Sequence, residues 1–189
     1  MPPTSNPAVP VVTTRRLKLR GWRDSDVEPF VSLNADPQVM EFFPDALDRV
    51  ESLSLVERLR SHWEEHGLGM WAVEETESGE FIGMIGLLVV GFDAPFTHDD
   101  VPPVEAGWRL RRQSWGHGYA SEAAAATLGW GLGKRRLPEI VSFTSVLNTR
   151  SIDVMERLGM THDPTDDFDH PALADGHPLR RHVLYRSTS

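Results

Sequence analysis

The sequence contains no cysteine. Disulfide bonds, thiolate nucleophiles and zinc sites with cysteine ligands are therefore excluded. It also contains no apolar run near the roughly 20 residues that a membrane-spanning helix needs. The first residues lack a basic start and a long apolar core, so they do not predict a signal peptide. We expect a cytoplasmic protein with no membrane partner.

Basic residues are in the minority, with 19 Lys and Arg against 28 Asp and Glu and a formal net charge of −9. Neutralising a nucleic-acid backbone needs a basic face, so we expect no nucleic-acid partner. One local basic cluster remains, at Arg109, Arg111 and Arg112. The sequence leaves a homodimer open.

The length of 189 residues favours one domain with a substantial core. Prolines at positions 2, 3, 7 and 10 predict a flexible tail over residues 1–12. Residues 13–189 are then a single domain.

The spacing of apolar residues predicts a mixed α/β fold. Strands are expected at 17–20, 70–75, 81–90, 104–110, 139–145 and 182–186. Helices are expected at 24–35, around 55–63 with a stop at Gly67, at 119–134 and at 148–158, and Asp36-Pro37 is a further helix start signal. Early hairpins followed by alternating strands and helices predict a mixed sheet.

The most informative segment is a glycine turn, Gly116-His117-Gly118, between the strand at 104–110 and an alanine-rich helix. Glycine lets the main chain approach an anion closely, and the first amides of a helix have no partner inside it. A P-loop pattern is absent, and the dinucleotide fingerprint is incomplete because Ser121 stands at its third small position. The turn predicts a phosphate site or, taken alone, a simple loop closure.

The residues around this turn carry a family resemblance. Gln113 to Ala123 resembles the acetyl-CoA motif of the GCN5-related N-acetyltransferase superfamily, in the form found in ribosomal-protein N-terminal acetyltransferases. Asn148 to Ser151 with Met155 to Met160 is a second match, and Thr14 to Arg20 is a third. The resemblance implies a mostly antiparallel sheet that splays near its middle, flanked by helices.

The resemblance also implies that acetyl-CoA is the cosubstrate and that no metal is required. Its pyrophosphate would lie on the amides of the glycine turn, and its peptide-like arm would pair with backbone between residues 108–110 and 143–145. Arg111 and Arg112 either reach the phosphates or are ordinary surface charges. The predicted coenzyme-binding residues are Trp108, Arg109, Leu110, Arg111, Gln113, Trp115, Gly116, His117, Gly118, Tyr119, Ala120, Asn148 and Ser151.

Glu105 is the candidate general base for acetyl transfer to an amine. The resemblance places it where a glutamate often acts, commonly through water. The alternative is a strand carboxylate that faces solvent or pairs with Arg109. The amide of Leu110 or Arg109 is the candidate oxyanion donor.

The proton donor to the leaving thiolate is less clear from sequence. Many relatives have a tyrosine where Met155 stands, and the chain's two tyrosines, Tyr119 and Tyr185, lie elsewhere. Ser151 is the candidate catalytic acid, with water as the alternative; Ser151 also fits a role in local backbone bonding.

Histidines and aspartates are concentrated between His162 and His182. No recognised metal spacing occurs among them, so we interpret this segment as an acidic loop that attracts a cationic amine. The predicted acceptor contacts are Phe168, Asp169 and His170.

The sequence thus predicts an N-acetyltransferase that acts on a protein N-terminus or a small-molecule amine. Two other classes stay open: a non-catalytic acyl-CoA-binding or sensor module, and a metal-binding module built on the histidine-rich segment.

Overall fold

The computed structural model describes residues 9–97 and 102–188. The part of the predicted flexible tail before residue 9 lies outside them. Residues 9–12 pack on the domain: Val9 contacts the core, and the Pro10 carbonyl accepts a hydrogen bond from the Trp71 indole at 2.7 Å. None of the described helices is both long and apolar enough to span a membrane.

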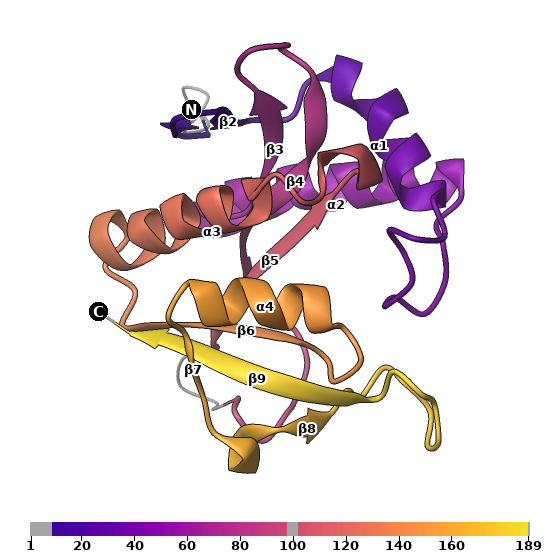
Figure 1. Cartoon of the computed structure of the whole chain (residues 1–189), viewed down its shortest axis with the longest axis vertical. Coiled ribbons are helices and arrows are strands. Elements are labelled where there is room, and N and C mark those ends of the chain that lie inside the picture. The colour runs from indigo at the N-terminus through magenta and orange to yellow at the C-terminus, as the bar shows by residue number, and fades with distance from the viewer. Residues whose placement is uncertain (1–8, 98–101, 189) are drawn as a thin grey trace, which may run out of the picture.

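Along the chain, the elements form a short hairpin, then two helices, then three consecutive antiparallel strands, and then alternating helices and strands (Figure 1). They are β1 (Val12–Thr13), β2 (Leu17–Arg20), η1 (Asp24–Asp26), α1 (Val27–Ala35), α2 (Arg49–His66), β3 (Met70–Glu75), β4 (Phe81–Val89), β5 (Val104–Leu110), η2 (Arg112–Ser114), α3 (Tyr119–Gly129), η3 (Trp130–Lys134), β6 (Glu139–Ser145), α4 (Thr149–Arg157), β7 (Thr161–His162), η4 (Pro164–Asp166), β8 (Phe168–Asp169) and β9 (Arg181–Thr188).

The strands form one sheet in the order β1-β2-β3-β4-β5-β6-β9-β7, and β8 pairs with β9. All neighbours are antiparallel except β5 and β6, which are parallel and share the single pair Glu105–Val141. Beyond that pair the two strands diverge, and β6 and β9 run in a different direction from β3 to β5 (Figure 1). The predicted mixed, mostly antiparallel and splayed sheet is confirmed.

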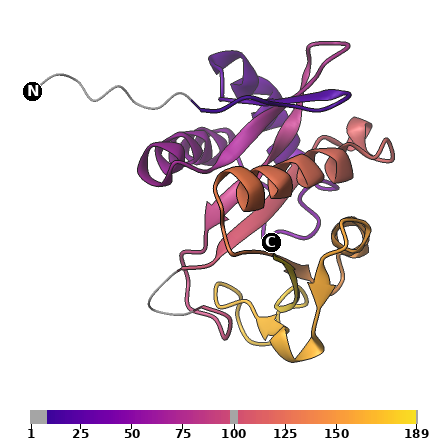
Figure 2. The same cartoon turned by 90° about the vertical axis from the view of Figure 1, so that its left-hand side faces the viewer.

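The two faces of the sheet carry different helices. Helix α3 crosses β4 and β5, and α4 lies against β6 and α3. Figure 2 shows α3 along its length and α4 nearly end-on. The opposite face holds a separate core, in which Phe30 and Leu33 of α1 and Val56 and Leu59 of α2 meet Met84 of β4. Both faces of the sheet are therefore covered by helices around the place where β5 and β6 diverge.

Two predicted helix features differ from the structure. No helix begins at Asp36-Pro37, because residues 37–39 form a turn; the next helix, α2, starts after Asp48, whose side chain accepts a hydrogen bond from the Glu51 amide. The predicted helix 119–134 is α-helical to Gly129 and then forms a π-helical turn. In that turn Gly131 lies against Ile140 and Leu87, where a Cβ would approach to within 2.6 Å.

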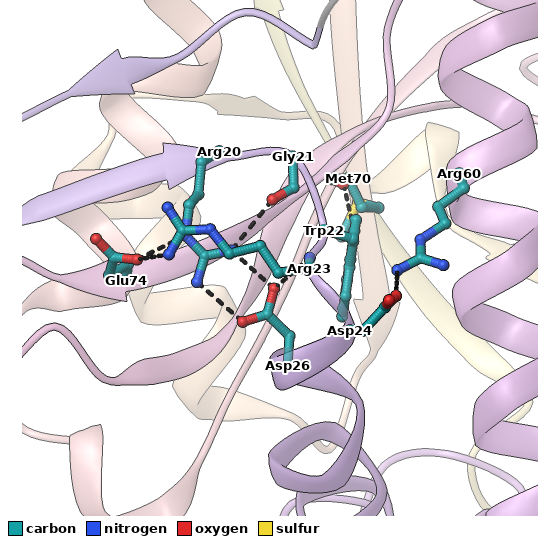
Figure 3. A network of polar contacts seen from close by, with 9 residues as sticks. All are labelled: Arg20, Gly21, Trp22, Arg23, Asp24, Asp26, Arg60, Met70 and Glu74. Carbon is teal, nitrogen blue, oxygen red and sulfur yellow. Dashed lines mark hydrogen bonds and ion pairs between the residues drawn. The ribbon is translucent and has the colours of Figure 1, made fainter.

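A buried ion-pair network fixes the entry of the chain into α1 (Figure 3). Arg20 donates to both carboxylate oxygens of Asp26, at 2.7 and 2.9 Å, and to Glu74 at 2.6 Å. The Trp22 indole beside it donates to the carbonyl oxygen of Met70 at 2.9 Å. Met70 begins β3 and lines the cleft described next, so this network supports one wall of the site.

Candidate active site

A cavity of about 830 Å³ occupies the splay between β5 and β6. It extends from the N-terminus of α3 to the loop before α2 and to the start of β9. Its lining residues are Val39, Phe42, Phe43, Pro44, Met70, Met84, Leu88, Glu105, Ala106, Gly107, Trp108, Arg109, Leu110, Ser114, Trp115, Gly116, Gly118, Tyr119, Ala120, Ser121, Ser142, Phe143, Thr144, Asn148, Arg150, Ser151, Asp153, Val154, Arg157, His170, Ala172, Leu173 and His182.

The splay leaves backbone groups of β5 without a strand partner. The Arg111 amide donates to Ile82 of β4, so the alternation of an antiparallel ladder directs the backbone groups of Leu110, Trp108 and Ala106 to the other edge. There the Ala106 carbonyl accepts from Ser142 at 2.8 Å and the Leu110 carbonyl accepts from the Trp115 indole at 2.9 Å. The amides of Leu110 and Trp108 and the Trp108 carbonyl remain directed at the cavity.

The glycine turn forms the end of the cavity at α3. Gly116 and Gly118 have φ of +78° and +76°, the left-handed region that favours glycine, and Gly118 is the N-cap of α3. The first hydrogen bond of α3 runs from the Glu122 amide to the Gly118 carbonyl. The preceding amides of the helix therefore have no partner within it, as an anion site requires.

The opening segment of the chain holds this turn in place. Glu122, in the first turn of α3, accepts hydrogen bonds from Thr14 at 2.6 Å and from the backbone and side chain of Arg16 at 2.8 and 2.7 Å. Burial tends to raise the pKa of Glu122, but these bonds outweigh it and hold the pKa below its ordinary value. The two segments that resemble the family, 14–20 and 113–123, are thus joined directly.

Most of the predicted coenzyme-binding residues lie on this cavity. They are Trp108, Arg109, Leu110, Trp115, Gly116, Gly118, Tyr119, Ala120, Asn148 and Ser151. Arg111, Gln113 and His117 do not line it. Arg111 pairs with Glu80 at 2.6 Å and, with Gln113, lines a smaller cavity of about 250 Å³ beside α1.

Two arginines of α4 line the cavity and were not predicted. Arg150 lies over the Trp115 ring at 4.6 Å and pairs with Glu41 at 2.6 Å. Arg157 donates to Ser121 at 3.3 Å and lies 3.8 Å from Asp153. Arg150 and Arg157 are seven residues apart, with Asp153 between them, so all three lie on one face of the helix. This spacing can be seen in the sequence and could have predicted that the two arginines lie together.

Glu105 lies in the cavity beside apolar neighbours. Leu88 is its cross-strand partner on β4, and Met70 and Met84 line the same region. Burial raises the pKa of Glu105 to about 8. Its carboxylate faces the cavity, and no ion pair joins it to Arg109 among the described residues. The side chain is therefore a carboxyl group that is largely protonated at pH 7 and half ionised near pH 8.

The residues at the start of α4 hold one another. Asn148 is the N-cap: its side-chain oxygen accepts from the Ser151 amide at 3.3 Å, and its amide nitrogen donates to Thr144 at 2.9 Å and to the Ser151 hydroxyl at 3.0 Å. Asn148 thus caps α4 and also lines the cavity, and both N–H donors of its side chain are already engaged. Met155 is fully buried in the core and does not line the cavity.

The acceptor contacts predicted in the C-terminal segment are only partly brought to the site. His170 lines the cavity and lies 5.0 Å from His182, ring to ring. Phe168 does not, since it is 2% exposed and packs against Phe92 and Phe96.

Asp169 also lies off the cavity, 3.5 Å from both Arg180 and Arg181. The Asp169 carboxylate is thus paired with arginines of its own segment. No group of three or more potential metal ligands occurs among residues 9–97 and 102–188.

Comparisons with known proteins find similarity over most of this chain. The model of the acetyltransferase (GNAT) domain matches residues 16–161. An uncharacterised protein, YkkB, of Bacillus subtilis is 30% identical over 155 residues, which are 82% of this chain and 87% of that protein. The FsC-acetyl coenzyme A-N(2)-transacetylase of Aspergillus fumigatus is 28% identical over 173 residues, covering 87% of this chain and 71% of its own.

A solved structure of an acetyltransferase from Agrobacterium tumefaciens has the same fold. It superposes with a TM-score of 0.75 and 28% sequence identity, and the match covers 96% of each chain. The family model spans the path from β2 through the glycine turn and α4 to the first residue of β7. The chain therefore belongs to the GNAT family and is an acetyltransferase.

Proposed function

We propose that this enzyme transfers an acetyl group from acetyl-CoA to a primary amine, directly, within the cavity between β5 and β6. The observation that carries the proposal is the continuity of this cavity from the glycine turn at Gly116 and Gly118 to the carboxyl group of Glu105. One end suits a phosphate group, and the other holds a group that can accept a proton.

The residues present fit coenzyme A. Its pyrophosphate is an anion suited to the first amides of α3, and Arg150 and Arg157 lie on the same cavity. The backbone of Trp108 offers one donor and one acceptor to the amides of the pantetheine arm, as an added strand would. Asn148 and Ser151 lie across the splay from that edge.

Glu105 is the proposed general base. The nitrogen of the amine attacks the thioester carbonyl carbon, a C–N bond forms and the C–S bond breaks, and the amine proton passes to Glu105 directly or through water. A base with a pKa of about 8 is well matched to an α-amine, whose pKa is also about 8. The Leu110 amide, directed at the cavity, is favoured over that of Arg109 as the oxyanion donor, because the latter points to β4.

The leaving thiolate needs only modest help, since a free thiol has a pKa of about 8.5. Ser151 is the proposed proton donor, with water as the alternative. The Asn148 side chain donates to the Ser151 hydroxyl and leaves its proton free to point into the cavity.

Both a protein N-terminus and a small-molecule amine remain candidate acceptors, and a cytoplasmic location is proposed with either. The name of the Aspergillus relative refers to transfer onto an N(2) nitrogen, and the resemblance to ribosomal-protein acetyltransferases favours a chain α-amine. Both observations point to a nitrogen atom as the nucleophile.

The test is release of free thiol from acetyl-CoA over a panel of amines, with mass spectrometry of the acetylated product. We expect turnover of at least one amine class and a loss of roughly a hundredfold in kcat for Glu105→Gln. Coenzyme binding without turnover of any amine, and with Glu105→Gln indistinguishable from wild type, would instead support the non-catalytic acyl-CoA-binding module.

A further inference from the structure

Arg109 differs from the other arginines that line the cavity. Arg150 is paired with Glu41 and Arg157 lies near Asp153, whereas Arg109 makes no ion pair with any described residue. Its guanidinium makes one side-chain hydrogen bond, from Nη1 to the Asn34 side-chain oxygen at 2.6 Å, and its Nε is buried without an acceptor. Four of the five N–H donors of this side chain thus have no side-chain or backbone acceptor within the described chain.

The surroundings of Arg109 are apolar and supply no counter-charge. Its cross-strand neighbour on β4 is Met84, and the Phe43 ring lies 4.1 Å from the guanidinium carbon. Burial lowers the pKa of Arg109 to about 10, so the group stays cationic at neutral pH. Glu105 does not compensate for it, because that carboxyl group is itself largely protonated at pH 7.

The Arg109 guanidinium is held in position by a hydrogen bond to Asn34, on the side away from the cavity. Asn34 is fully buried, and its amide nitrogen donates to the buried hydroxyl of Ser52 at 3.1 Å. This bond leaves the amide oxygen of Asn34 to face Arg109. An unpaired cation that is costly to bury, and is nevertheless held by a dedicated buried amide, is a preorganised anion receptor.

We propose that Arg109 binds a carboxylate of the acceptor, so that this enzyme acetylates amines that carry a carboxylate in the same molecule. The inference rests on the proposed function, because it takes the amine to react at Glu105. Gly107 lies between the two residues on this face and adds no side chain there; a Cβ would be in ordinary contact with Glu105 Oε1, at 3.7 Å, and with Met70, at 3.9 Å.

The spacing also indicates the form of the acceptor. Glu105 and Arg109 lie four residues apart on one face of a regular strand, which separates their Cα atoms by about 13 Å. A polyamine, with cations along its whole length, would place a like charge against Arg109 and is selected against.

The experiment compares matched acceptors with and without the carboxylate, at equal concentrations of unprotonated amine, because amidation also lowers the pKa of a neighbouring amine. One arm uses free amino acids of increasing amine-to-carboxylate separation and their amides; a second uses short amidated peptides that begin with Asp or with Asn. The two arms show whether the acceptor that carries the amine and the carboxylate is a free amino acid or the N-terminus of a peptide. Wild type should favour the carboxylate member of a pair by roughly tenfold or more in kcat/KM.

Arg109→Met should remove this preference, mainly by raising KM for the carboxylate acceptor, and Arg109→Lys should restore part of it. Arg58→Met is the matched control, because Arg58 is exposed on α2 and its loss should leave the preference intact. A preference for the amide members, or an unchanged preference in Arg109→Met, overturns the inference.

A binding measurement separates this inference from the proposed function. Titration calorimetry with N-acetylated amino acids and their amides, in the presence of coenzyme A, requires no turnover. If no amine is acetylated, the proposed function fails, but selective binding of the acids by wild type and not by Arg109→Met still supports the carboxylate site. Equal binding of acids and amides, or none by wild type, overturns the site whatever the catalytic result.

Discussion

Glu105 and Arg109 lie on the same face of β5, and both face the cavity without contacting each other. Their cross-strand partners, Leu88 and Met84, are apolar. Burial therefore acts on the two groups in opposite directions: it raises the pKa of the carboxyl group to about 8 and lowers that of the guanidinium to about 10. The strand thus presents one neutral acid and one unpaired cation to whatever enters.

The pH dependence of acetyl transfer tests the first of these. A base must be unprotonated to act, so kcat/KM should rise with pH through about pH 8, where Glu105 is half ionised, and level off only above it. Glu105→Gln should lower kcat roughly a hundredfold and lose that ionisation from the profile. Because the acceptor amine titrates identically with both proteins, the ratio of their rates isolates Glu105. A ratio that does not change between pH 6 and pH 9 would contradict the assignment.

The same shift predicts a change in stability. A carboxyl group whose pKa is raised on folding favours the folded protein below its ordinary pKa and loses that contribution as pH rises through about 8. Glu105→Gln, which cannot ionise, should thus unfold at a higher temperature than wild type at pH 9. At pH 4 the two proteins should be alike. The measurement is thermal unfolding followed by circular dichroism at both pH values. If the unfolding temperatures of the two proteins differ by the same amount at pH 4 and at pH 9, the raised pKa of Glu105 is contradicted.

The parts of the site that could be predicted from sequence depend on local signals. The strands 104–110 and 139–145 have the predicted bounds, because alternation along a strand needs no tertiary information. The glycine turn is likewise local, since its backbone conformation restricts the residues that can form it. The family resemblance added the splay, which no local pattern encodes.

The parts that could not be predicted depend on distant partners. Phe168 follows two aspartates, as a loop residue would, but aromatic residues from the segment after β4 cover it. Arg111 is adjacent to the coenzyme motif in sequence, but it forms an ion pair with Glu80 of the β3–β4 hairpin and does not line the cavity. In both cases the decisive contact comes from a segment more than thirty positions away in the sequence.

The left-handed conformation of Gly116 predicts a binding defect. A Cβ at Gly116 would meet no protein atom within 4 Å, so within the protein Gly116→Ala acts through the backbone, at about 1 kcal/mol or more. Asn tolerates this conformation better, so Gly116→Asn should weaken coenzyme A binding less than Gly116→Ala does. Gly79→Ala is the control: it has φ of +71° and equal space, but lies on the β3–β4 turn away from the cavity. Calorimetry should find coenzyme A binding unchanged in the control, and an equal loss in all three variants would exclude a local role for the turn.

The ion pair between Arg20 and Asp26 predicts a loss of stability that is independent of the active-site chemistry. Both side chains are at most 5% exposed, so Asp26→Asn leaves a buried guanidinium with Glu74 as its remaining carboxylate partner. The free energy of unfolding should fall by about 3 kcal/mol, as for other broken buried pairs. Glu28→Gln, which breaks the exposed pair with Arg49, is the matched control and should change stability little. Because Arg20 supports the segment whose Trp22 holds Met70, a damaged wall should also weaken coenzyme A binding, so denaturant melts of Asp26→Asn should show a larger fall with coenzyme A than without it. A loss in Asp26→Asn no greater than that in Glu28→Gln would mean that the network does not anchor this wall of the cavity.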